Sequence, residues 1–452
     1  MEIINDVLWG GIMLVLLFSV HLYFTASCKF PQRHIFRAIR NSFSGNTEGK
    51  SAFTCLTINL ASTIGAGNII GVAMAIVMGG PGAVFWCWIT GVLGVATHYA
   101  ESLICIRYRS KDSHGTYHGG PMYVLKQIGN SKAACVYASF AACCGLCIGS
   151  MVPANSIAET AKLTFGISPY IIAAAVSLLT GLVIIGGIKS IGNVCSRIMP
   201  AVIILYILAF ITIIIRNFQF IPQSISMILN GAFNIRAGAS GILGYNVGKA
   251  IRYGVSRSLF SNEAGMGSAG ITASAMEHGK PENQAMISAT ATFWDTVVLA
   301  GITGFAFVTA IAAEPSTYNG LNGMELTIKI FDSLPDILSF SMPIMLIILG
   351  FSTIIGWCYI GEQAFSFLFK NTSIYRILWL IAAFTGCIMS LNAVWELCDI
   401  LNIFMILPNI FALWRLRKIP QKSEIKLLRN TQSTKHLRKN LLEVNKSQCL
   451  KF

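Results

Sequence analysis

The sequence Ser62-Thr63-Ile64-Gly65-Ala66-Gly67-Asn68-Ile69-Ile70-Gly71 lies inside an apolar run from about residue 52 to residue 78. This run is long enough to cross a bilayer, which takes roughly 20 residues. Glycine disfavours a helix interior, and irregular backbone survives in a membrane only where it is buried in protein or lines a cavity. The stretch therefore predicts two half-helices, and the N–H groups that begin the second would face a small anionic group. The alternative is that Gly67 and Gly71 only let two helices pack closely.

The composition is typical of a protein that crosses the membrane several times. Of the 452 residues, 54% are apolar and 12% are charged, with a mean hydropathy of +0.65. Soluble domains are about 25% charged. Residues 415–452 hold eleven Lys or Arg and two Glu, a large share of the net charge of +14. A basic tail beside anionic lipid explains this charge more simply than nucleic-acid binding does, so no nucleic-acid partner is expected.

The apolar runs predict eleven membrane spans, and the charged loops between them alternate in sign. Five Lys or Arg follow the first span and five follow the third, whereas residues 313–336 hold four acids and one Lys. By the positive-inside rule, this alternation places the N-terminus outside the cell and the C-terminus in the cytoplasm. The spans are predicted at about 7–27, 52–78, 82–105, 133–154, 168–188, 198–215, 241–275, 285–312, 338–367, 374–391 and 393–414.

A second unusual run, from Ala250 to Gly270, carries a carboxylate, an amide, hydroxyls and glycines near its centre. Its Gly265-Met266-Gly267-Ser268 repeats the Gly-x-Gly-polar pattern of residues 65–68, five spans later. Because five is odd, the second half would have inverted topology, and two such breaks indicate the binding site of a secondary transporter. The expected units are an extra N-terminal helix with a basic loop (1–50), two inverted repeats (51–237 and 238–414) and a basic cytoplasmic tail (415–452).

Four motifs, which match in order between about residues 50 and 415, identify a resemblance. They are Gly79-Gly80-Pro81-Gly82-Ala83-Val84-Phe85-Trp86-Cys87-Trp88-Ile89, Leu259-Phe260-Ser261-Asn262-Glu263-Ala264-Gly265-Met266-Gly267-Ser268-Ala269, Phe351-Ser352-Thr353-Ile354-Ile355-Gly356-Trp357, and Trp395-Glu396-Leu397-Cys398-Asp399-Ile400-Leu401-Asn402. The chain thereby resembles the sodium:alanine symporters, the alanine or glycine:cation symporter family.

The resemblance implies an all-α LeuT-type core of five-plus-five inverted helices after one extra N-terminal helix, which agrees with eleven spans. It also implies sodium-coupled symport of small neutral amino acids, alanine and glycine foremost, across the bacterial inner membrane. Sodium would be co-transported, and the lipid bilayer and the amino acid would be the partners. We expect a monomer, and an enzyme is disfavoured because the sequence shows no HExxH, GxSxG or paired intramembrane Asp motif.

Three positions depart from the pattern common in that family. Ala66 stands where the family commonly has Thr, Pro153 where it has Gln, and Gly270 where it usually has Pro. The first two lie where the family's substrate is held. They leave open a symporter that uses protons or takes another small amino acid, and a nutrient receptor that binds substrate without transporting it.

The substrate would be a zwitterion bound at the two breaks. Its carboxylate would meet backbone N–H groups at the start of the half-helix, and its ammonium would meet oxygens of the broken seventh span. An aromatic side chain in the ninth span would limit its size, although the same side chain could simply pack in the bundle or sit at the interface. The candidate substrate-binding residues are Gly65, Ala66, Gly67, Asn68, Ser261, Asn262 and Trp357.

Sodium prefers oxygen ligands, and the LeuT-type fold that the resemblance implies has a sodium site between its first and eighth core helices. These correspond to the second and ninth spans of this chain. The competing interpretation is that the hydroxyls only bond carbonyls of their own helices. The candidate sodium ligands are Thr63, Gly65, Asn68, Ser352 and Thr353.

Glu263, Asp295 and Asp399 are among the acids that lie inside predicted spans, where ionisable groups usually mark a pathway or a paired contact. Glu263 could relay a proton or cation, or it could pair with Arg252 or Arg257 or contact a helix end. Asp295 and Asp399 are each expected to anchor one helix to another rather than to bind the ion.

Overall fold

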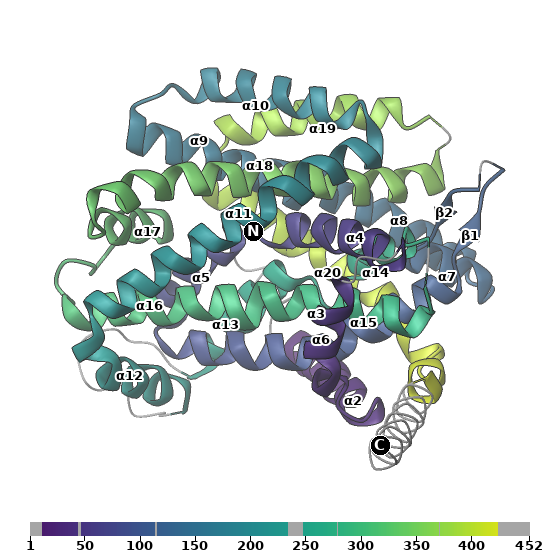
Figure 1. Ribbon diagram of the computed structural model, residues 1–452, viewed down its shortest axis with the longest axis horizontal. Helices are drawn as coiled ribbons and strands as arrows, with labels where there is room; N and C mark the ends of the chain where they lie inside the picture. Colours follow the sequence, from purple (N-terminus) through teal and green to yellow (C-terminus); the bar gives the residue numbers. More distant parts are fainter. Residues whose placement is uncertain are drawn as a thin grey trace, which may run out of the picture.

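The computed structural model describes residues 11–43, 47–113, 115–233, 247–277, 279–369 and 371–423. It is a bundle of helices with one small hairpin (Figure 1). The elements are α2 (Gly11–Ser27), η1 (Pro31–His34), α3 (Ile35–Ser42), α4 (Thr47–Thr63), η2 (Ala66–Asn68), α5 (Ile70–Gly79), α6 (Gly82–Arg107), β1 (Ser110–Lys111), β2 (Tyr117–His118), α7 (Pro121–Gln127), α8 (Ser131–Cys144), η3 (Gly145–Met151), α9 (Val152–Phe165), α10 (Pro169–Ile184), α11 (Gly187–Arg216), η4 (Phe218–Phe220), α12 (Ile221–Phe233), α13 (Val247–Asn262), α14 (Ser268–Ser274), α15 (Pro281–Thr292), η6 (Phe293–Ala300), α16 (Gly301–Ala313), α17 (Gly323–Asp332), α18 (Asp336–Leu368), α19 (Ser373–Ile388) and α20 (Leu391–Arg415).

The helices have the length and composition of membrane spans. Within the described residues, five helices are long and apolar enough to cross a bilayer, or up to seven if each bent pair counts as one span, and three shorter apolar helices accompany them. Large apolar side chains also cover the outside of the bundle, as at Ile185 (74% exposed) and Leu178 (66% exposed). Such a surface would be unstable in water and is suited to lipid. The count of eleven spans and the inverted repeat remain predictions.

Most predicted spans agree with a helix to within a few residues at each end, but three regions differ. The fourth span was expected to end at residue 154, whereas the helical path runs on to Phe165. The sixth span was expected to begin at residue 198, whereas α11 already begins at Gly187 and contains Pro200. Residues 313–336 were expected to form only a loop, yet they contain α17. Asn322 caps this helix by accepting hydrogen bonds from the N–H groups of Met324 and Glu325 at 3.0 Å each. The tail beyond residue 423 and the side chain of Asp399 lie outside the described part of the chain.

The first predicted break is present. α4 and α5 are separated by residues 64–69, and the segments Phe53–Thr63 and Ala66–Gly79 meet at 59°. Gly65 is fully extended (φ −150°, ψ −156°) at the point where the α-helical path stops. One short 3₁₀ turn, η2, then leads into α5. The polar, glycine-rich centre of this apolar run therefore encodes a bend rather than a straight helix.

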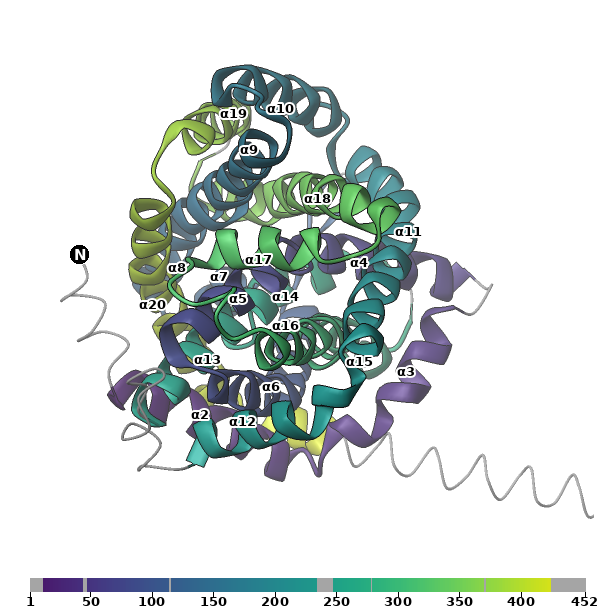
Figure 2. The ribbon, with the colours of Figure 1, turned by 90° about the vertical axis from the view of Figure 1, so that its left-hand side faces the viewer.

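The second predicted break separates α13 from α14. Glu263, Gly265 and Gly267 all have positive φ, at 57°, 99° and 85°. Glycine adopts this backbone conformation readily, whereas Glu263 must be held in it by its surroundings. Figure 2 shows α5 and α14 in the interior of the bundle, with α18 on one side and α6 on the other. Both breaks are therefore enclosed by the same set of long helices.

Candidate functional site

A pocket opens directly against the first break. It holds about 300 Å³ of empty space, which includes the open space at its mouth. Four parts of the chain that are far apart in sequence form its walls: the break itself, the η3–α9 region, the end of α13 and the middle of α18. The lining residues are Ser62, Thr63, Gly65, Ala66, Gly67, Ile148, Val152, Pro153, Phe260, Thr353 and Trp357.

Six of the ten predicted site residues meet at this pocket. Of the candidate substrate residues, Gly65, Ala66, Gly67 and Trp357 line it. Two candidate sodium ligands, Thr63 and Thr353, line it as well. The departure at Pro153 also faces this space, as the sequence comparison with the family had implied.

The pocket lining does not include the other four predicted site residues, which are Asn68, Ser261, Asn262 and Ser352.

The break offers fewer N–H groups to a carboxylate than the sequence predicted. The N–H of Gly65 donates to Asn68 Oδ1 at 2.9 Å, and the N–H of Asn68 donates to the Gly65 carbonyl at 3.2 Å. The turn therefore uses two of the four predicted donors to hold itself together. Within the described residues, Ala66 and Gly67 keep the N–H groups that a helix start leaves without an intrahelical partner.

The glycines of the break let neighbouring helices approach it closely. A Cβ added at Gly67 would lie 3.3 Å from Cδ1 of Phe260, and one added at Gly65 would overlap the Thr353 hydroxyl. Trp357 closes the pocket from α18 and is completely buried. The space beside the break is therefore small, and larger side chains at these positions would fill it.

Trp357 is held in place by Glu263, the residue with the left-handed backbone at the second break. The indole N–H donates to Glu263 Oε1 at 2.7 Å, and the Ser268 hydroxyl donates to Glu263 Oε2 at 2.5 Å. The predicted alternatives for Glu263 were a relay or a contact with an arginine or a helix end. The hydrogen bond to Ser268, the first residue of α14, is a helix-end contact. Glu263 thus joins the second break to the wall of the pocket.

Asp295 joins the two breaks behind the pocket. It lies in η6, a π-helical segment of a kind often found at functional sites. Its carboxylate accepts hydrogen bonds from Asn68 Nδ2 at 2.7 Å and from Ser261 Oγ at 2.8 Å. Asn68 lies within the first break and Ser261 lies just before the second, so Asp295 ties both breaks to the eighth predicted span. These contacts agree with the expected role of Asp295 as an anchor.

The predicted sodium ligands are not all directed at one point. Thr63 Oγ1 donates to the Asn59 carbonyl at 3.0 Å, and Ser352 Oγ and Thr353 Oγ1 donate to the Leu349 carbonyl at 2.8 Å and 3.1 Å. The competing interpretation, in which these hydroxyls bond their own helices, describes this arrangement. A hydroxyl that donates in this way keeps lone pairs for a cation. Thr63 and Thr353 remain usable ligands at the pocket, whereas Asn68 faces Asp295.

Asn262 stabilises the end of α13 instead of pointing into the pocket. Its Nδ2 donates to Ser258 Oγ at 3.1 Å, and its Oδ1 accepts from the N–H of Ala264 at 2.9 Å. Asparagine commonly bonds backbone groups just beyond itself in this way. The prediction that Asn262 binds the ammonium group receives no support from this geometry.

Sequence reasoning missed the side chains that hold the second break open. Asn409 Nδ2 donates to Glu101 Oε1 at 2.5 Å and to the Gly265 carbonyl at 2.9 Å. The Tyr137 hydroxyl donates to the Met266 carbonyl at 2.9 Å. These donors satisfy carbonyls that the interrupted helix leaves without partners. An acid inside the third predicted span was the one available signal for Glu101.

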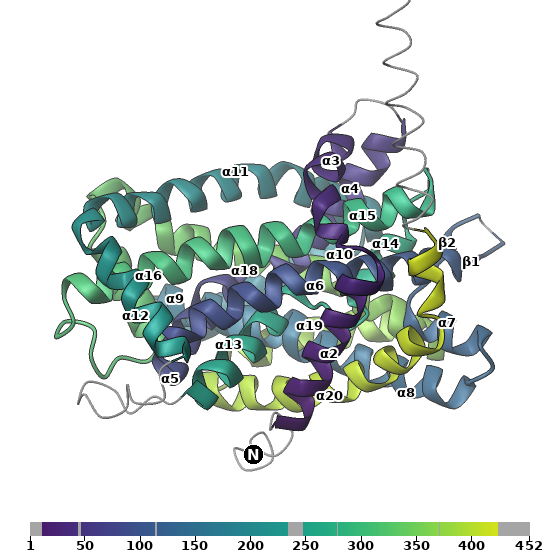
Figure 3. The ribbon, with the colours of Figure 1, turned by 90° about the horizontal axis from the view of Figure 1, so that it is seen from below.

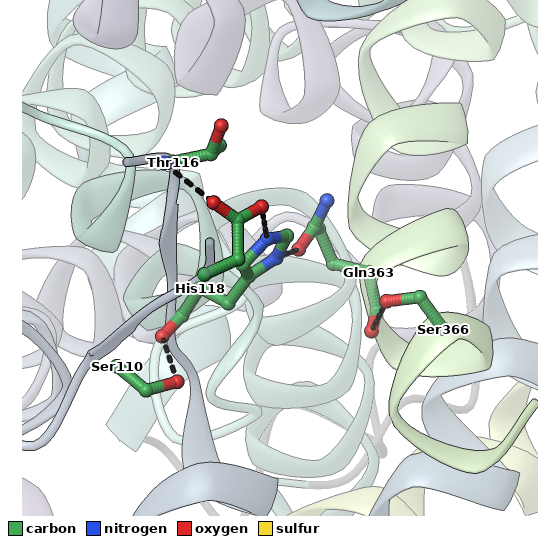
Figure 4. Close-up of polar contacts among 6 residues, drawn as sticks. Ser110, Thr116, His118, Gln363 and Ser366 are labelled. Carbon is green, nitrogen blue, oxygen red and sulfur yellow. Dashed lines mark hydrogen bonds and ion pairs between the residues drawn. The ribbon is translucent and has the colours of Figure 1, made fainter. Parts of the chain in front are cut away.

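A hairpin of β1 and β2 ties down the ends of two central helices. His118 lies between two side chains (Figure 4). Its Nε2 is 3.1 Å from Asp112 Oδ2, and its Nδ1 is 2.8 Å from Gln363 Oε1 of α18. Next to it, Arg109 Nη1 donates to the Ser274 carbonyl at the end of α14 at 3.1 Å. A cation at a helix C-terminus is a favourable contact. The hairpin therefore fastens the half-helix α14 and the end of α18 at one face of the bundle.

Comparisons with known proteins agree with this architecture. The family described as "Sodium:alanine symporter family" matches residues 1–440. The sodium/alanine symporter AgcS of Methanococcus maripaludis is 39% identical over 450 residues, 97% of each chain. The probable sodium/glutamine symporter GlnT of Bacillus subtilis is 32% identical over 429 residues, which cover 92% of this chain and 88% of GlnT.

A solved structure supports the fold. The crystal structure of MhsT in complex with L-phenylalanine superposes with a TM-score of 0.59 at 15% identity, and the match covers 82% of this chain and 91% of that one. At this identity the likeness concerns the fold alone. It confirms the predicted LeuT-type architecture.

Proposed function

Because the chain belongs to the sodium:alanine symporter family, we propose that it couples the entry of sodium to the uptake of alanine and glycine. The chain is a secondary transporter of amino acids in a membrane, and not an enzyme. The observation that carries the finer proposal is the pocket against the first break, which combines N–H donors with small, mostly apolar walls. This combination suits a zwitterion with a short side chain.

The substrate carboxylate is proposed to meet the N–H groups of Ala66 and Gly67. Helix starts bind anions in this way without a positively charged side chain. The short side chain would point toward Ile148, Val152 and Pro153, which line the pocket with apolar atoms. A longer polar side chain, such as that of glutamine, would meet these same walls. We therefore expect this chain to prefer alanine and glycine over glutamine.

Sodium is proposed to bind where oxygens of the first break and α18 meet, at Thr63, Gly65 and Thr353. Asp295 would support coupling from behind the pocket, because its carboxylate contacts Asn68 and Ser261 at the two breaks. A cation that draws these segments together would favour the state with both breaks closed around substrate. Coupling requires such a difference in affinity between two states.

A proton-coupled symporter or one with another small substrate is the alternative, favoured by the apolar Pro153 and Ala66 in the lining. The test is labelled-alanine uptake into proteoliposomes, with an inward sodium gradient compared with an equal potassium gradient. Uptake of alanine under the sodium gradient but not under the potassium gradient, with inhibition by unlabelled glycine, supports the proposal. Equal uptake driven by a pH gradient supports the alternative, and binding without flux under any gradient indicates a receptor.

We further propose that the chain is a monomer in the bacterial inner membrane, with its N-terminus outside and its C-terminus in the cytoplasm. Arg107, Arg109 and Lys111 lie at the same end of the bundle as the hairpin, as the positive-inside rule expects for a cytoplasmic face. A single reactive cysteine placed in the hairpin should be labelled by an impermeant reagent only from the cytoplasmic side. Labelling from outside would reverse the orientation.

A further inference from the structure

One wall of the pocket beside the first break is the helical path that runs from η3 into α9. Ile148, Val152 and Pro153 of this path line the pocket. Figures 1 and 3 show α9 beside α18, and η3 lies so close to α18 that a Cβ added at Gly149 would overlap Trp357. The side chains of the three lining residues are apolar, so a polar contact from this wall must come from its backbone.

The backbone of this wall has a carbonyl that its own helix does not satisfy. η3 is π-helical, so its N–H groups donate to carbonyls five residues earlier. Val152, directly after η3, continues this pattern, because its N–H donates to the Cys147 carbonyl. The next carbonyl, that of Ile148, would accept from residue 153, but this residue is proline and has no N–H. The Ile148 carbonyl is therefore left without a donor from its helix.

The neighbouring side-chain donors of the same path are engaged elsewhere. Ser150 Oγ donates to a carbonyl of α19 at 3.1 Å, and Asn155 Nδ2 donates to the Gly386 carbonyl of the same helix at 3.0 Å. Ser156 Oγ donates to a carbonyl of its own helix at 3.0 Å. Ile148 is buried, and a buried carbonyl without a partner costs free energy. A donor on a ligand in the pocket would remove this cost.

The ammonium group of the substrate carries hydrogen-bond donors only and needs acceptors. Neither predicted ammonium ligand lines the pocket, since Asn262 caps the end of α13 and Ser261 donates to the carboxylate in η6. We propose that the Ile148 carbonyl accepts a hydrogen bond from the substrate ammonium, while the N–H groups of Ala66 and Gly67 hold the carboxylate. The ammonium and the side chain share the α-carbon, so both can face this wall. The assignment rests on the proposed function, because it places alanine or glycine in this pocket.

Pro153 determines whether this acceptor is free, because any other residue at this position has an N–H that pairs with the Ile148 carbonyl. The test uses the full-length protein and the Kd of alanine, measured by calorimetry in saturating sodium. Pro153→Val supplies the N–H and keeps an apolar side chain of similar size, whereas Pro153→Ala supplies it with a smaller one. Both should raise the Kd about tenfold, the effect of losing a hydrogen bond to a charged group.

Two comparisons separate this contact from packing. Propionate keeps the carboxylate and the short apolar chain of alanine but lacks the ammonium, so its inhibition constant against labelled alanine should be unchanged in both variants. Pro200→Ala is the matched control, because it also replaces a proline inside a helix, in α11 and outside the pocket lining. It should leave the Kd of alanine unchanged. The Tm of Pro153→Ala should be no lower than that of the wild type, since its helix gains a hydrogen bond.

Sodium-dependent alanine binding with the same Kd in the wild type and in both Pro153 variants would overturn the role of the Ile148 carbonyl and leave the proposed function standing. Weaker binding by only one of the two variants, or a parallel rise in the inhibition constant of propionate, would trace the effect to packing and overturn the role as well. Failure of the wild-type protein to bind alanine in sodium would instead refute the proposed function on which the assignment rests.

Discussion

Enlarging Gly67 should impair transport in proportion to the size of the added side chain, and Gly67→Leu should abolish it in a protein that still folds. A Cβ at this position would lie 3.3 Å from Cδ1 and 3.5 Å from Cε1 of Phe260. The methyl group of Gly67→Ala therefore forces Phe260 to move by a few tenths of an ångström. Overpacking of this kind costs about 1–3 kcal/mol in stability. Where about 1.4 kcal/mol of this cost falls on the substrate-bound state alone, the affinity for alanine falls about tenfold. Gly67→Leu adds three further carbons and should fill the space beside the break.

The assay is the initial rate of labelled-alanine uptake into proteoliposomes under a sodium gradient. Gly67→Ala should raise KM about tenfold, and Gly67→Leu should reduce uptake to background. Gly181→Ala is the control, because its Cβ would make an ordinary contact 3.6 Å from Leu380 in α19. Size-exclusion profiles should show that all three variants fold. Uptake by Gly67→Leu at the wild-type rate would refute the proposal that substrate binds against this break.

Three other predictions concern the groups around the pocket. Asp295→Asn should weaken the dependence of uptake on sodium, seen as a smaller ratio of rates in sodium and potassium; an unchanged ratio would restrict Asp295 to a structural role. Trp357→Phe removes the hydrogen bond to Glu263 and leaves that buried carboxyl group with one partner fewer, which costs about 1–3 kcal/mol, so it should lower the Tm and raise KM; an unchanged Tm would contradict that bond. Arg109→Gln should lower the Tm by releasing the carbonyl of Ser274 at the end of α14, and a Tm equal to that of the wild type would show that the hairpin does not fasten this helix.

The two breaks could be predicted because their signals are local. Gly65 and Gly67 interrupt an apolar run, and a glycine in the middle of a span is a cost that needs a reason. The backbone confirms the expectation with a 59° bend at the first break. The positive φ of Gly265 and Gly267 confirms it at the second. Local chemistry was sufficient here because a helix either continues or stops within a few residues.

The directions of the polar side chains could not be predicted in the same way. Asn68 is next to Gly67 in sequence, yet its amide binds Asp295, which lies 227 residues away. Glu101 and Asn409 are separated by 308 residues and meet at the second break. Such pairs depend on how the long helices pack, and a single sequence contains no local pattern that fixes this packing. The number of spans and the division into two repeats also concern the arrangement of the whole bundle, and they remain predictions.

The central claim is that sodium and alanine stabilise the same closed state around the first break. The most direct test is the Kd of alanine for the purified protein, measured by calorimetry in saturating sodium and again in potassium at equal ionic strength. The account predicts binding at least about tenfold tighter in sodium, a coupling of about 1.4 kcal/mol. It also predicts that alanine tightens sodium binding by the same factor. Equal affinities in the two salts would contradict sodium coupling at this site.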